Sequence, residues 1–174
     1  ISVFNINAQN EILNTDNFSS GDGVKVGALT NIEALTIGGR PFVIVGGFGE
    51  VPIAVFEIGI DGNLELSDQV LGSDALILGR IFSLEAFDID GRAYVAAGGD
   101  RGSLSVFAIS NEGTLTLSAF LEGSNDARAD PTTDIAVQQF GDKTILIASG
   151  QEGDGIATFR FFESRDTVTF LTRR

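Results

Sequence analysis

The sequence contains no cysteine, histidine, methionine or tryptophan among its 174 residues. Without cysteine and histidine the chain offers no disulfide, no Cys/His zinc site, no thiolate nucleophile and no Ser-His-Asp triad. The absence of methionine indicates a processed chain or a part of a longer one. No run approaches the roughly 18 consecutive apolar residues of a membrane-spanning helix, so we do not expect membrane insertion.

Basic residues are also scarce, with 11 Lys and Arg against 24 Asp and Glu and a net charge of −13. Nucleic acids and anionic membrane surfaces both require basic patches, so neither is an expected partner. The acidic balance fits a solvated surface suited to a salty exterior, or a site for a cation. The 43% hydrophobic content and the length indicate one folded domain spanning residues 1–174.

An internal repeat organises the chain. The tetrads ISVF (1–4), IAVF (53–56), LSVF (104–107) and IATF (156–159) place their phenylalanines 52, 51 and 52 residues apart. A second marker, a glycine before an apolar strand that ends in a small-residue pair, returns at Gly39, Gly91 and Gly141 with nearly the same spacing. The repeat predicts one structural unit of about 50 residues.

Each unit contains four short apolar runs with turn residues between them. In one full unit they are 81–89, 93–97, 104–109 and 114–121, rich in Val, Ile, Leu, Phe and Thr. No helical spacing appears. Four antiparallel strands with short links, followed by a long return, predict an all-β fold made of β-propeller blades. The tetrad phenylalanines Phe4, Phe56, Phe107 and Phe159 are expected to pack between blades.

We expect 14 strands, or about 3.5 blades. The boundaries are a half blade at 1–31, formed by the third and fourth strands of a unit, and blades at 32–80, 81–133 and 134–174. Closed propellers have about four to eight blades, so an isolated arc leaves the apolar faces of its first and last blades uncovered. The partner that completes the ring is either the rest of a longer parent chain or another chain, and a free monomer is not expected.

The segment 94–107, YVAAGGDRGSLSVF, followed by NEGTLTL at 111–117, resembles the repeat of the lactonase-like (YVTN-type) seven-bladed propellers. It is also similar to propeller segments of large secreted bacterial proteins of the calcium-binding RTX kind. The resemblance covers nearly the whole chain. It implies a propeller fold and an extracellular, cell-surface or periplasmic location, and it leaves the activity open because the same blade serves enzymes and binding modules.

The sharpest candidate site is the pair Glu33 and Glu85. Each lies six residues before the marker glycine, near the start of the innermost strand, which would place both at the mouth of the central channel. Such a pair can ligate Ca²⁺, as in some hydrolases of this fold, or can accept hydrogen bonds from the backbone of the neighbouring blade. The third unit differs, with Ile135 at this position and Asp134 beside it.

Further ligand contacts are expected on the face with the longer loops. The charged residues of these loops are Asp22, Glu50, Asp74, Arg80, Asp100, Arg101, Glu122, Asp126, Arg128, Asp130, Glu152 and Asp154. Two functions follow from the sequence. The first is a non-enzymatic scaffold or interaction module of a secreted or surface bacterial protein, with no catalytic residue assigned. The second is a lactonase-like or other metal-assisted hydrolase that uses the channel-mouth carboxylates.

Overall fold

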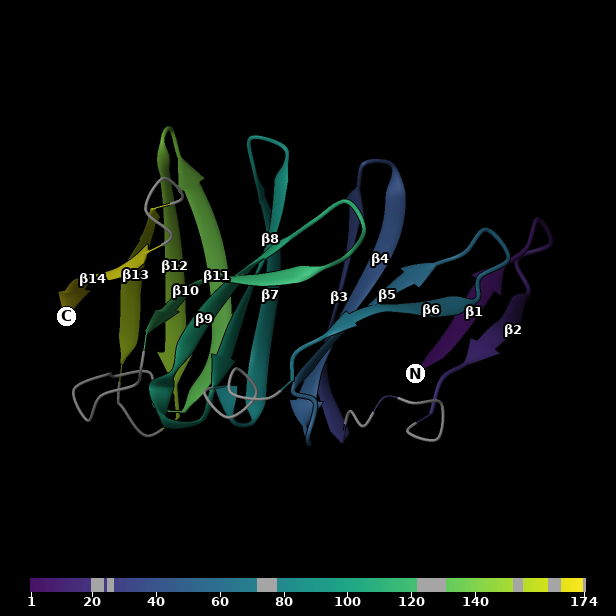
Figure 1. Ribbon diagram of the computed structural model, residues 1–174, viewed down its shortest axis with the longest axis horizontal. Helices are drawn as coiled ribbons and strands as arrows, with labels where there is room; N and C mark the ends of the chain where they lie inside the picture. Colours follow the sequence, from purple (N-terminus) through teal and green to yellow (C-terminus); the bar gives the residue numbers. More distant parts are fainter. Residues whose placement is uncertain are drawn as a thin grey trace.

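The computed structural model describes residues 1–19, 24, 27–71, 78–121, 131–151, 155–162 and 167–173, with only the backbone described at residue 101 and in 167–173. In these residues the chain forms fourteen β-strands, β1 to β14. Figure 1 shows the strands grouped into sheets that follow one another in chain order from the N-terminal to the C-terminal end of the molecule. None of the helices in the described ranges is long and apolar enough to cross a membrane.

The strands form one two-stranded and three four-stranded antiparallel sheets within the described residues. The first sheet consists of β1 (Ser2–Ile6) and β2 (Ile12–Asn17). The second sheet consists of β3 (Ala28–Ile37), β4 (Arg40–Phe48), β5 (Ile53–Ile58) and β6 (Leu64–Gln69). The all-β class and the four-stranded antiparallel sheets predicted from the repeat are therefore confirmed.

The remaining two sheets repeat the same strand order. The third sheet consists of β7 (Ile81–Ile89), β8 (Arg92–Gly99), β9 (Leu104–Ile109) and β10 (Leu115–Leu121), with the 3₁₀ turn η1 (Asp100–Gly102) between β8 and β9. The fourth sheet consists of β11 (Thr132–Phe140), β12 (Lys143–Gly150), β13 (Ile156–Phe162) and β14 (Thr167–Arg173). In each sheet neighbouring strands along the chain are neighbours in space, so the sheet is a meander.

A two-residue turn joins the first two strands of each four-stranded sheet. The turn between β3 and β4 has φ values of 57° at Gly38 and 83° at Gly39, and that between β7 and β8 has 49° at Asp90 and 83° at Gly91. Such left-handed pairs are the hairpin turns whose twist matches that of the flanking strands. The Asp88 carboxylate accepts a hydrogen bond from the Gly91 amide at 3.0 Å and closes its turn.

The fourth sheet uses its marker glycine differently, and this corrects the alignment of the repeat. Phe140 pairs with Lys143, so Gly141, with φ 59°, is the first turn residue, whereas Gly91 is the second. Counting back from the turn therefore places Ala136, not Ile135, at the position of Glu33 and Glu85. The sequence marker is one residue out of register there because glycine suits either turn position.

The tetrad phenylalanines of the four-stranded sheets pack on the preceding sheet. Phe56 is fully buried in a cluster to which Ile1, Val3 and Phe18 of the first sheet contribute, and its ring centroid lies 4.7 Å from that of Phe18. Phe107 is 2% exposed and joins the cluster formed with the second sheet. Phe159 is likewise 2% exposed against the third sheet. These three phenylalanines confirm the expected packing between sheets.

Phe4 does not follow this pattern, and the expectation that it lies in the core is wrong. It is 58% exposed, although it occupies the same position of the tetrad. Its neighbours on the same face, Ile6 and Ile12, are 66% and 69% exposed. Its neighbour Val3 packs toward the second sheet, so Phe4 lies on the opposite face of β1, and the described residues contain no sheet on that side.

Candidate functional site

Glu33 and Glu85 occupy matching positions on β3 and β7, the two strands through which the second and third sheets meet. Glu33 pairs with Ile44 and Glu85 with Ala96, in the middle of their strands, which corrects the expectation that they lie near the strand start. Both residues are half-buried. The repeat thus places one carboxylate on each of two adjoining innermost strands.

Each carboxylate lies close to the backbone of the next sheet. The Ala86 backbone of β7 lowers the pKa of Glu33, and the Val137 backbone of β11 lowers the pKa of Glu85, against the raising effect of burial. Ala86 and Val137 are themselves equivalent, because each directly follows the residue at the carboxylate position of its strand. This placement fits the backbone-acceptor alternative raised by the sequence, which stays a prediction.

Burial and mutual repulsion make ionisation of these groups unfavourable. Partial burial raises the pKa of Glu33 above its usual value, although the Ala86 backbone opposes the shift. Burial also raises the pKa of Glu85, and the negative charges of Glu33 and Asp134 raise it further. The pair is therefore an electrostatically costly position with no cation paired to it in the described residues.

A calcium site at Glu33 and Glu85 stays a prediction. Ca²⁺ takes about six to eight oxygen ligands, so two carboxylates would need further donors. Among the described residues, no group of three or more acidic side chains is placed to hold a metal ion. Ala136, which takes the equivalent position on β11, adds no third carboxylate.

A second pair of carboxylates connects the sheets at the outer strands. Asp16 of β2 accepts a hydrogen bond from the Leu64 amide at 2.7 Å, and Asp68 of β6 accepts one from the Leu115 amide at 2.7 Å. Sequence reasoning did not single out these residues. The signal was present, because each aspartate lies twelve residues after the phenylalanine of its tetrad. These two hydrogen bonds join the outer strands of consecutive sheets.

Most of the charged loop residues expected to contact a ligand lie outside the described residues. They are Asp22, Asp74, Glu122, Asp126, Arg128, Asp130, Glu152 and Asp154, together with the side chain of Arg101. Of the others, Arg80 and Asp100 form an ion pair with Nε and Oδ2 3.0 Å apart. The Arg80 guanidinium also lies 5.5 Å from the Phe48 ring and 5.7 Å from the Phe82 ring. This cluster joins two sheets rather than presenting free charges.

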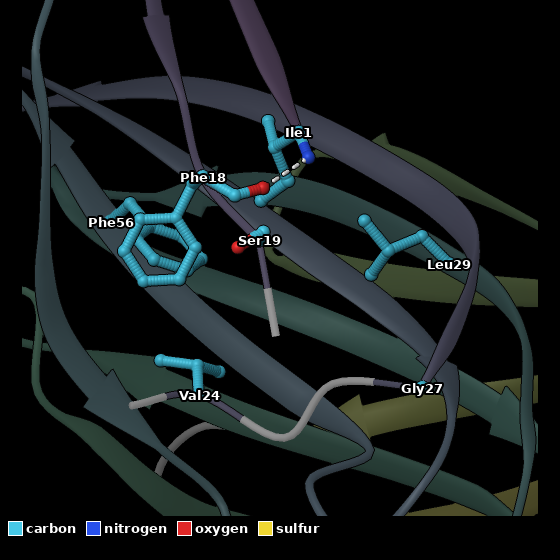
Figure 2. A pocket seen from close by; sticks show the side chains of 7 residues that line it. All are labelled: Ile1, Phe18, Ser19, Val24, Gly27, Leu29 and Phe56. Carbon is cyan, nitrogen blue, oxygen red and sulfur yellow. Dashed lines mark hydrogen bonds between the residues drawn. The ribbon is translucent and has the colours of Figure 1, made fainter. Parts of the chain in front are cut away.

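A pocket of about 350 Å³ opens between the first and second sheets. Its lining comes from the residues just before β1, just after β2 and around the beginning of β3, together with one side chain of β5, as Figure 2 shows. The lining residues are Ile1, Phe18, Ser19, Val24, Gly27, Leu29 and Phe56. At its rim the Ile1 amine donates a hydrogen bond to the Phe18 carbonyl at 2.8 Å. None of the described lining residues carries a charged side chain, which favours an apolar occupant over an ionic ligand.

No protein-family model and no curated protein matches this chain.

Proposed function

We propose that this chain is an arc of a β-propeller, with three four-stranded blades and the outer half of a fourth, that acts as a non-enzymatic scaffold or interaction module of a secreted or surface bacterial protein. The observation that carries the proposal is the repeated sheet: three antiparallel meanders of matched register, each packing its tetrad phenylalanine on the sheet before it. Repetition of this kind is typical of propeller blades.

The use of the acidic side chains supports a scaffold. Asp16 and Asp68 accept backbone hydrogen bonds from the following sheet, and Glu33 and Glu85 lie beside the backbone of the following sheet, which opposes the rise in their pKa that burial causes. Their spacing follows the repeat, as expected of groups that hold repeated units together. Catalytic carboxylates would instead be concentrated around one cleft with open access to a substrate.

The alternative is a metal-assisted hydrolase, and one observation favours it. Glu85 has a raised pKa and lies near two further carboxylates, Glu33 and Asp134, which is the environment of many general acids. A hydrolase would lose its activity on esters and lactones when Glu85 is replaced by glutamine. A scaffold would show no such activity in either protein.

The test of the arc is the association state of the 174-residue chain in solution, measured by light scattering together with negative-stain electron microscopy. We expect a species larger than one chain, because the exposed apolar face at Phe4, Ile6 and Ile12 requires cover. Ring-shaped particles would support the propeller. A monodisperse monomer with a cooperative thermal transition would overturn the proposal that this arc needs a partner.

A further inference from the structure

Strand β1 has one free edge. In the four-stranded sheets the equivalent strands β5, β9 and β13 each pair with a strand on both sides, whereas β1 pairs only with β2 among the described residues. The free edge presents backbone donors and acceptors that an added strand can use. Beside this edge lies the apolar pocket that Ile1 and Leu29 line.

The inner strand next to this edge exposes two side chains that are buried elsewhere in the repeat. Counted back from the hairpin turn, Leu29 of β3 is equivalent to Ile81 of β7, and their exposed fractions are 41% and 0%. Ile32 is equivalent to Leu84, with exposed fractions of 61% and 4%. The same side-chain direction therefore gives burial in one sheet and exposure in the other.

In the covered sheets, a glycine on the second strand of the preceding sheet lies directly against these positions of the innermost strand. A Cβ atom added to Gly46 of β4 would lie 2.9 Å from both Ile81 Cγ2 and Leu84 Cδ1. One added to Gly98 of β8 would lie 2.4 Å from Thr132 Cγ2 on the next innermost strand. At both contacts only a residue without a side chain lets the strand approach this closely.

The position of these glycines fixes the register of a strand added to β1. Gly46 pairs with Ile53, and Gly98 pairs with Leu104. Ile53 and Leu104 open the tetrads, as Ile1 does in the first sheet. A strand that pairs with β1 in the same register would place its glycine opposite Ile1 and over Leu29 and Ile32.

We propose that the free edge of β1, with Leu29 and Ile32, is a docking site for a two-stranded antiparallel β-hairpin that carries glycine opposite Ile1. The hairpin extends the first sheet to four strands, and its glycine-bearing strand covers the two exposed side chains of β3. The proposal rests on the proposed function for the equivalence of the sheets, and it adds the chemistry of the partner and its register.

The chain itself supplies a hairpin for the test. A copy of residues 81–103 placed directly before Ile1 has the spacing that β7 and β8 have relative to Leu104. Because the sequence has no cysteine, Ile32→Cys introduces a single thiol whose labelling rate by a maleimide reports cover at the site. Ile60, which is fully exposed at the turn between β5 and β6, provides the matched control Ile60→Cys.

We expect the appended hairpin to slow labelling at position 32 by about tenfold or more, since a covered thiol reacts only through local opening. Labelling of the Ile60→Cys protein should not change. A second fusion, with valine replacing glycine at the position of the appended copy that corresponds to Gly98, should label at position 32 as fast as the unfused chain. Far-UV circular dichroism of each fusion checks that the sheets are retained.

Two results would overturn the docking site. One is an unchanged labelling rate at position 32 in the fusion, and the other is equal slowing by the glycine and valine copies. Neither result bears on the proposed arc, whose test is the association state of the unfused chain. A monomeric unfused chain together with slowed labelling in the fusion would reject the required ring partner and retain the hairpin site.

Discussion

The first and third sheets present the same tetrad in opposite surroundings. Phe107 of the third sheet is 2% exposed and packs on the second sheet, whereas Phe4 of the first is 58% exposed. The repeat sets the direction in which the ring points, and the neighbouring sheet decides whether the ring is buried. One sequence motif can therefore be a core position in one unit and an interface position in another.

The largest expected effect comes from truncating the two rings. Phe107→Ala should lower the free energy of unfolding by about 3–5 kcal/mol, the usual range for a buried aromatic. Phe4→Ala should change it by no more than about 0.5 kcal/mol, as at exposed positions. Urea unfolding at a concentration where light scattering detects single chains measures both. Equal losses would contradict the contrast between the sheets.

Equivalent positions on the inner strands β3 and β7 should also differ in their contribution to stability. Leu84→Ala should cost about 2–5 kcal/mol, because Leu84 packs against Gly46 of the preceding sheet. Ile32→Ala at the equivalent position should cost about 0.5 kcal/mol or less. Thermal unfolding of the two variants under identical conditions provides the test. A large loss at Ile32 would mean that the site is already covered in solution.

Replacing Asp16 of the first sheet or Asp68 of the second sheet should lower the free energy of unfolding by similar amounts. Removing the carboxylate leaves the partner amide without its acceptor, so Asp68→Ala should cost about 1–2 kcal/mol. Asp16→Ala should cost a similar amount, since both hydrogen bonds are 2.7 Å long. Asp68→Asn keeps an acceptor oxygen and should lose less. Chemical denaturation that showed no loss for either alanine variant would reject their role in joining the sheets.

Glu85 should give a smaller, pH-dependent effect. Its raised pKa means that the folded state holds the proton more tightly than the unfolded chain, so its contribution to stability is present at acid pH and is lost as pH rises through the folded pKa. Glu85→Gln should therefore melt at a higher temperature than the wild type at neutral pH, and the difference should disappear below about pH 4.5. Glu33→Gln should show a weaker gain, because neighbouring charges raise the pKa of Glu85 in particular.

The exposed Glu65 supplies the control for this measurement. Glu65→Gln should leave the melting temperature nearly unchanged across the same pH range. A melting temperature for Glu85→Gln below that of the wild type at neutral pH would show that the carboxylate stabilises the fold as an anion.

The calcium hypothesis has the smallest expected effect. Because the described residues place no third acidic side chain with Glu33 and Glu85 to hold a metal ion, we expect about 1 mM Ca²⁺, a concentration that occupies many extracellular sites, to shift the wild type and the Glu33→Gln/Glu85→Gln double variant equally. Differential scanning calorimetry measures both shifts. A stabilisation confined to the wild type would instead support a calcium site formed by this pair.

The strands were predictable from the sequence, because turn residues and β-branched runs determine the backbone conformation of the segment in which they occur. The runs predicted at residues 81–89 and 104–109 match β7 and β9 as observed. Sequence reasoning was wrong where one residue type serves two positions. Glycine suits either place in a two-residue turn, so counting from Gly141 selected Ile135, whereas strand pairing selects Ala136.

The candidate site was less predictable because it depends on neighbours in space. The spacing of Glu33 and Glu85 correctly indicated equivalent positions in adjoining sheets. It did not reveal that they lie in mid-strand, since that depends on how far β3 and β7 extend before the turn. The tetrad alone did not distinguish Phe4 from its buried counterparts, although the count of 3.5 blades indicated that no sheet covers the apolar face of the first blade.

The apolar clusters also constrain how this molecule opens. Each cluster joins only consecutive sheets, so the stability of one sheet is transmitted chiefly to its immediate neighbours. The second and third sheets have a neighbour on both sides, whereas the first and fourth have one each within the described chain. Amide hydrogen exchange should therefore be slowest in β4, β5, β8 and β9 and faster toward β1 and β14, so that unfolding begins at the ends of the array and proceeds inward.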